Sequence, residues 1–207
     1  MPLGANKAAI MGVAGVSTGD VVLIYDQDHT DASTVSITSG IDSTYGEYIF
    51  KFYKINPATA GGLFSFQANV AGQSGYNETI TSSAFVTRHA EGDGTADLGV
   101  VGYDQAQENL FQNLSYDPAN DADASLTGEL HIFNPSSTTY VKHFWATTTG
   151  MIRNGAGMTA QYFTGGYFNV TGAIDEVQFK CSTGNFDGTI KTVSYTHLRA
   201  HETGRKL

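Results

Sequence analysis

Two groups of oxygen-bearing side chains are the first places in this sequence where chemistry could occur. Asp26, Asp28 and Asp31 lie close together after a short apolar run. A second group lies further along the chain and comprises Asp117, Asn120, Asp121 and Asp123. Closely spaced carboxylate and amide oxygens suit a hard cation such as Ca²⁺, but neither group has the spacing of an EF-hand loop. Asp also serves as an ordinary residue of solvated turns. We favour that interpretation, so both groups are weak calcium candidates and no metal is assigned.

The histidines are the next candidates for acid–base or metal chemistry. His29, His89, His131 and His143 are far apart in the sequence. A hairpin could bring His131 and His143 together, but a mid-strand histidine commonly presents an apolar ring with one satisfied nitrogen, so we favour structural roles. No nucleophile elbow and no phosphate-binding glycine loop occur in the sequence. We therefore expect no catalytic residue, no cofactor and no enzymatic activity.

Aromatic side chains suggest a different kind of site. Tyr53, Tyr140 and Trp145 fall at positions that we expect to be exposed, and exposed aromatic residues often anchor protein interfaces. In residues 47–53, alternation places Tyr48, Phe50 and Phe52 on one face of a strand and Tyr53 on the other. The sequence therefore predicts interface anchors at Tyr53, Tyr140 and Trp145.

The composition favours one domain built from strands. The chain has 207 residues, 15% of them charged, with 24 Gly, a formal net charge of −9 and a single cysteine, Cys181. Basic residues form no cluster, which argues against a nucleic-acid partner, and no apolar run is long enough to span a membrane. Residues 1–20 are rich in small residues and predict an arm that lies against this or a neighbouring subunit.

Short runs of β-branched and aromatic residues, separated by turn signals, continue from residue 21 to residue 191. About ten such runs predict an all-β domain, an antiparallel two-sheet β-sandwich of jelly-roll type, with a closed barrel as the competing arrangement. The clearest predicted hairpin joins residues 128–133 to residues 139–146 through the loop at residues 134–138. A second turn is predicted at residues 185–188, where Asp-Gly leads into a last strand that opens at Thr189.

The pattern changes at Thr192, and residues 192–207 are predicted to be a non-native tail. Residues 193–203 resemble one reading frame of the transposase-type adapter used in short-read DNA sequencing. The tail contains His197 and His201, which mimic a metal half-site on a helix and are set aside for this reason. Without the tail the chain keeps 8 basic and 19 acidic residues, so its formal charge is −11.

Three segments carry a resemblance to a known class of protein: residues 3–12, residues 129–142, and residues 174–179 with 185–191. They resemble small virion-associated proteins of tailed bacteriophages, over nearly all of residues 1–191. The resemblance implies a β-sandwich subunit of the particle, in the capsid decoration, tail or fibre apparatus, with no catalytic residues. In such proteins Met or Leu, Tyr and Gly follow the final Gly-Thr-Ile-Lys, and Thr192 departs from that pattern.

The ending of the domain leaves an alternative open. Residues 174–179 and 186–190 are also similar to concanavalin-like and laminin-G-like carbohydrate-binding sandwiches. We expect a virion structural protein that packs with other virion subunits, as a homo-oligomer. The alternative is a carbohydrate-binding module whose partner is a host surface glycan.

Overall fold

The computed structural model describes residues 21–153 and 157–195. The predicted arm at residues 1–20 and residues 196–207 of the predicted tail lie outside the described residues. The described part contains strands and no helix, and therefore no helix that could cross a membrane. Its strands are β1 Val21–Ala32, β2 Val35–Ile37, β3 Glu47–Pro57, β4 Phe64–Val70, β5 Ile80–Ala90, β6 Ala96–Val100, β7 Ala106–Glu108, β8 Gln112–Asn113, β9 Leu126–Phe133, β10 Lys142–Ile152, β11 Met158–Phe168, β12 Ile174–Cys181 and β13 Phe186–Tyr195.

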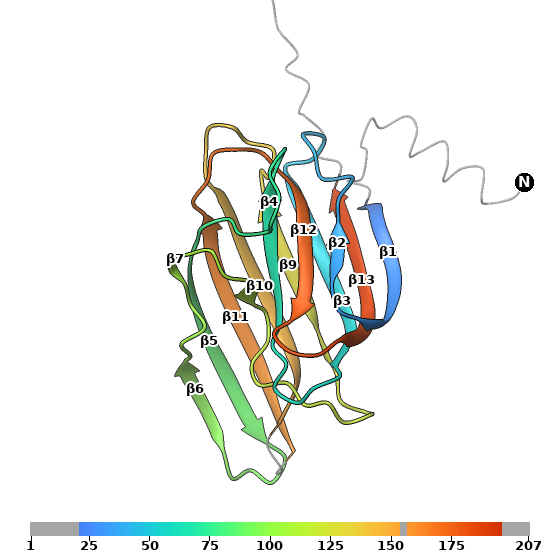
Figure 1. The fold of residues 1–207 in the computed structure, drawn as a ribbon. Helices are drawn as coiled ribbons and strands as arrows, with labels where there is room; N and C mark the ends of the chain where they lie inside the picture. The colour runs from blue at the N-terminus through green and yellow to red at the C-terminus, as the bar shows by residue number, and fades with distance from the viewer. Residues whose placement is uncertain (1–20, 154–156, 196–207) are drawn as a thin grey trace, which may run out of the picture.

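The strands form two antiparallel sheets that lie face to face, with the smaller sheet in front in Figure 1. The larger sheet has nine strands in the order β1-β13-β3-β9-β10-β11-β5-β6, with β7 also paired to β5. The smaller sheet has four strands in the order β2-β12-β4-β8. The predicted all-β class and the two-sheet sandwich are confirmed.

An aromatic core holds the two sheets together. Phe50 and Phe52 point inward from β3, as the alternation predicted, and are fully buried. Both rings contact Phe179 of the smaller sheet, at centroid distances of 5.5 and 5.3 Å, and Phe64 of β4 stacks on the same ring. Burial of one such side chain contributes about 2 kcal/mol, so this cluster accounts for much of the attraction between the layers.

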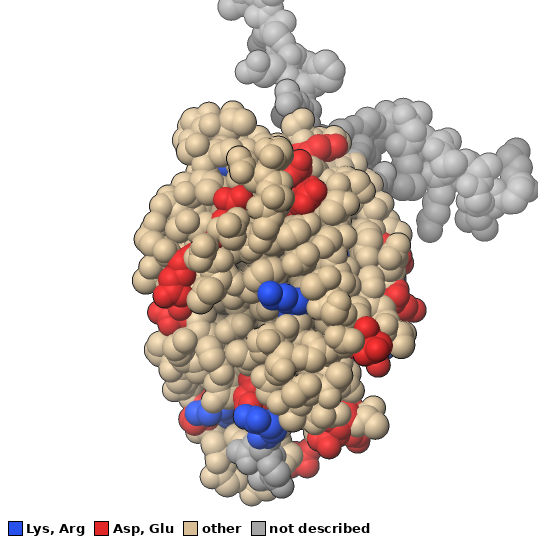
Figure 2. All heavy atoms as spheres, viewed as in Figure 1, with Lys and Arg blue, Asp and Glu red and all other residues tan. Residues whose placement is uncertain are grey.

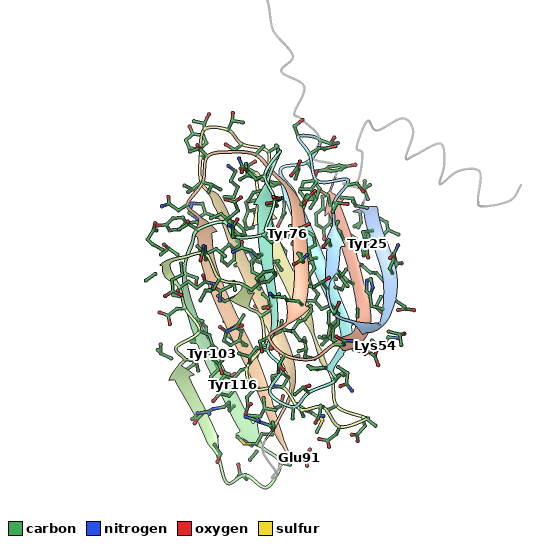
Figure 3. All side chains as sticks on the ribbon, in the orientation of Figure 1. Tyr25, Lys54, Tyr76, Glu91, Tyr103 and Tyr116 are labelled. Atoms are coloured by element: carbon green, nitrogen blue, oxygen red, sulfur yellow. The ribbon has the colours of Figure 1, made fainter. Side chains whose placement is uncertain are left out.

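The smaller sheet does not cover the β5–β11 end of the larger sheet. There the segment that follows β6 closes the core, and its Tyr103 and Tyr116 lie in front of β5 and β11 (Figure 3). Tyr103 packs 6.1 Å from Tyr116 and 6.4 Å from the buried ring of Tyr162, measured between centroids. The sandwich is therefore completed at this end by a long connection rather than by a strand.

Two details of the predicted strand pattern were wrong. The segment at residues 185–188 is not a hairpin turn, because Phe186 to Gly188 already belong to β13, and β12 and β13 lie in different sheets. Asp187 and Gly188 instead lie at an irregularity in the β13–β3 register, where Gly188 takes a φ of +149°. The connection between β9 and β10 is also longer than predicted, since β10 begins at Lys142.

The last strand lies inside the larger sheet. β13 pairs with β1 on one side and β3 on the other, so its residues, Ile190 among them, lie inside the sheet and not at an edge. The strand continues to Tyr195, past the predicted boundary of the tail, and Val193 pairs with both Leu23 and Ile49. The first residues of the predicted tail therefore occupy interior sheet positions.

Candidate functional site

The outer face of the nine-stranded sheet, which the smaller sheet does not cover, brings the most promising side chains together. Strand register places Lys51, Glu129, Thr147, Phe163 and Phe85 in one row across five neighbouring strands. The adjacent row on the same face consists of Ile49, His131, Trp145, Gly165 and Ser83. Side chains two positions apart on a strand share a face, so these rows form one surface.

Trp145 lies at the centre of this surface, between His131 and Gly165 in its row. Its ring stacks on the His131 ring, with centroids 3.9 Å apart and planes 14° apart. His131 is itself fixed between two carboxylates: its Nδ1 lies 2.6 Å from Glu47 Oε1, and its Nε2 lies 3.3 Å from Glu129 Oε1. One face of the indole is therefore occupied, and on the β11 side Trp145 lines a hollow together with its register partner Gly165.

A slot opens over Gly165 because this residue has no side chain. A Cβ built there would have its nearest neighbours at 3.7 Å, an ordinary van der Waals distance, so the position has room for a small side chain. The slot has a volume of about 310 Å³ and is lined on its sides by Trp145, Thr147 and Phe163. Phe163 stacks on Phe85 with a centroid distance of 4.6 Å, which stiffens the second aromatic wall.

A groove with both polar and apolar lining lies next to the slot and shares Thr147 with it. It also has a volume of about 310 Å³, and its other lining residues include Tyr53, Thr149 and Gln161. Thr149 and Gln161 then border a third hollow, of about 480 Å³, beside β5 and β6. The three hollows therefore form a continuous track across the outer face.

The charges within this track neutralise each other. Lys51 Nζ donates to Glu129 Oε2 at 3.0 Å. Burial favours a higher pKa for the Glu129 carboxyl, but the hydrogen bonds from Lys51 and His131 outweigh it and hold the pKa below its ordinary value. The bond to Glu129 likewise raises the pKa of Lys51. The track thus offers hydrogen-bonding groups but no unpaired lysine or arginine.

The first group of calcium candidates does not converge on one point. Asp26, Asp28 and Asp31 do not follow the strand but all belong to β1. Lys191 Nζ lies 2.9 Å from Asp26 Oδ2, and a hydrogen bond from Thr189 lowers the pKa of Asp28. Asp31 Oδ1 instead accepts a hydrogen bond of 2.8 Å from the side chain of Asn185.

The second acidic group is also dispersed. Asp117 pairs with Arg153 at 3.1 Å, and the amide of Asn120 donates to the carbonyl of Ala58. Within residues 21–153 and 157–195, no three His, Cys, Asp or Glu side chains are placed to hold a metal ion.

The two histidines considered as a pair are held apart. Trp145, and not His143, lies opposite His131 in the β9–β10 register. His143 packs against Tyr167 at 5.8 Å. The pairing of β9 with β10 therefore places Trp145 opposite His131, and not His143.

The predicted interface anchors do not all share one surface. Tyr53 and Trp145 lie on the outer face, with exposed fractions of 42% and 39%. Tyr140 is 74% exposed, but it lies in the loop between β9 and β10. Sequence reasoning missed Gly165, whose importance depends on the register of β10 with β11, and the apolar strand β6, whose Leu98 and Val100 were not distinguished from core residues.

The face of the molecule that carries β12 and β4 has few charged side chains. Uncharged side chains predominate there, and the acidic side chains are more widespread than the basic ones (Figure 2). Few basic side chains lie on this face, and those near its lower end in Figure 2 have acidic side chains beside them, which weakens any attraction for phosphates.

Comparison with known proteins assigns no family. No family model and no curated protein matches the chain. A solved structure described as infectious bursal disease virus Gx strain is similar to it at 15% identity and a TM-score of 0.14. That alignment covers 86% of this chain and 40% of the other, and so low a score carries no argument about fold or function.

Proposed function

We propose that this chain is a non-enzymatic structural subunit of a bacteriophage virion, located in the capsid decoration, tail or fibre apparatus. It would act by packing against other virion subunits, including copies of itself. The observation that carries the proposal is the apolar edge strand β6. Leu98 and Val100 are 69% and 88% exposed there, beside the exposed ring of Phe85.

An exposed apolar edge strand such as β6 is suited to pairing with another subunit. β6 ends the strand order of the larger sheet, so its outward N–H and C=O groups have no strand partner among the described residues. Soluble monomers usually protect such edges with charges, prolines or bulges because an apolar edge promotes association. In β6 the one charged residue, Asp97, forms a bidentate pair with Arg88 at 2.7 and 2.8 Å.

The negative net charge opposes self-association, and β6 is a surface where this repulsion is weak. A chain with a formal charge of −9 repels its own copies through most of its surface. At β6 that repulsion is small, because Arg88 neutralises Asp97 and the remaining side chains are uncharged. Both this edge and the sequence resemblance to virion-associated proteins support an assembly role.

Mass spectrometry of purified phage particles from the source sample tests the proposal. Peptides from residues 21–191 should be recovered in the particle fraction in constant ratio to the major capsid protein, through successive density gradients. Recovery only in the soluble lysate, with none in the particles, would overturn the proposal.

A further inference from the structure

We infer that the outer face of β10 and β11 carries a binding site for neutral carbohydrate, with one sugar ring seated in the slot over Gly165 against the free face of Trp145. This inference goes beyond the assembly role, which depends on β6. It rests on the shape of the slot, on the groups around it and on their charge.

The slot suits a ring that has one apolar face. His131 occupies one side of the Trp145 indole, at 3.9 Å, and leaves the other side facing the space over Gly165. The Phe163–Phe85 stack forms a second aromatic wall. The C–H groups on one side of a pyranose pack on such walls, whereas its hydroxyl groups need polar partners at the rim.

Those polar partners lie where the slot opens into the groove. Thr147 borders both hollows, and Thr149 and Gln161 continue the track. Hydroxyl and amide groups both donate and accept, so they match sugar hydroxyls in either direction. The Lys51–Glu129 pair adds a charged donor and acceptor that already satisfy each other. The length of the track, three connected hollows, indicates an oligosaccharide rather than a single sugar.

The same groups disfavour other occupants. An anion or nucleotide would need an unpaired cation, and the only cation lining the slot and the groove, Lys51, is paired with Glu129. An extended peptide would gain most by adding to a sheet edge, where backbone groups are free, whereas this track crosses the middle of the sheet. A lipid chain would leave the Thr and Gln groups of the groove without partners.

The single tryptophan of the chain makes the site directly measurable, since all tryptophan fluorescence comes from Trp145. The full chain would be titrated with a panel of neutral oligosaccharides: cello-, manno-, galacto- and chito-tetraose. We expect at least one to shift the Trp145 emission saturably at millimolar concentration or below, with the same affinity by isothermal calorimetry.

Gly165→Val fills the slot and is the decisive variant. The strand tolerates a Cβ at this position, since the nearest atoms would lie at 3.7 Å, so the fold should be retained. Oligosaccharide binding should weaken about tenfold or more, because the valine side chain would occupy the space of the sugar ring. Gly99→Val is the matched control: it places the same side chain on β6 in open space and should leave binding unchanged.

Thr147→Val is a second test of the site, because valine has nearly the same shape as threonine but lacks the hydroxyl group. Loss of one hydroxyl partner should weaken binding about fivefold. Absence of saturable binding to the entire panel would overturn the inference. Binding that Gly165→Val leaves intact would also overturn it, because the sugar would then occupy another site. Neither result would affect the assembly role, which particle composition tests separately.

Discussion

Thr192 places a hydroxyl group in the core without a hydrogen-bond partner. Its side chain is fully buried, and Oγ1 contacts no acceptor or donor. A buried polar group in this condition costs about 1 to 3 kcal/mol. Thr192→Val keeps the shape and removes the hydroxyl, so we expect the free energy of unfolding to increase by about 1 kcal/mol, measured by urea denaturation.

Thr148 supplies the control for this substitution. It is also buried, but its hydroxyl donates to the carbonyl of Leu114. Thr148→Val should therefore lower the free energy of unfolding by about 1 kcal/mol. If both valine variants were destabilised equally, the position at residue 192 would have a polar partner after all. The stabilising result would fit the apolar residue that the phage resemblance predicts after Lys191.

Lys142 should make stability depend on pH in the alkaline range. Its fully buried ammonium group donates to the carbonyls of Val170, at 3.2 Å, and Gly172. Burial lowers the pKa of Lys142 below its ordinary 10.5, although Glu78 opposes the shift. Between the folded and unfolded pKa values the unfolded chain binds more protons, so stability rises with pH in that window.

The comparison with Lys142→Met isolates this effect. We expect the free energy of unfolding of the original protein, relative to the variant, to rise with pH as the pH approaches the ordinary lysine pKa of 10.5 from below. Cys181, whose pKa burial raises to about 12, destabilises both proteins equally as its thiol ionises on unfolding, so it cancels in the difference. Parallel pH profiles for the two proteins would contradict the prediction.

At the scale of the element, β6 should control self-association. Leu98→Lys together with Val100→Lys places two charges on the exposed apolar edge. If copies pack through this edge, the double variant should shift from oligomer toward monomer in light scattering after size exclusion. Leu110→Lys adds one lysine at an exposed leucine outside β6 and should leave the oligomer unchanged. Equal dissociation by both changes would indicate a general charge effect.

The long strands could be predicted from the sequence because their side chains alternate between core and surface. Residues 47–53, where alternation placed Tyr48, Phe50 and Phe52 on one face, lie within β3. The two short strands β7 and β8 were missed, since three or two residues carry no periodicity and become strands only by pairing with β5 and β4. The Asp-Gly signal failed because a local turn preference does not determine which sheet the next strand joins.

The candidate site was predictable only in part. Tyr53 and Trp145 were selected because they are aromatic, and both lie on the outer face. The contact of Trp145 with His131 and the slot at Gly165 depend on the register of three neighbouring strands. Register comes from long-range pairing, so one sequence without a structure does not reveal which residues meet across strands.

At the scale of the whole molecule, the last strand determines how much of the chain the domain needs. Residues 192–195 pair with β1, and Thr192 and Val193 also pair with β3. A chain that ends after Tyr195 keeps all these pairs and should unfold at the same temperature as the full chain. A chain that ends after Lys191 loses them, and its unfolding temperature should fall by about 5 to 10 °C. Thermal unfolding followed by circular dichroism compares the two, and equal losses would contradict this account.

The position of β13 between β1 and β3 also sets the order in which the protein can be completed during synthesis. β1 is translated before the other described strands, yet its partner in the sheet, β13, is translated after them. Until β13 has emerged from the ribosome, β1 has no neighbouring strand. The edge of β3 that pairs with β13 in the finished sheet is unpaired as well. Closure of this end must wait for the C-terminal residues, and pairing across so long a separation is slow. A nascent chain therefore carries an unfinished edge through most of its translation, which is the period when it is most exposed to aggregation and most dependent on chaperones.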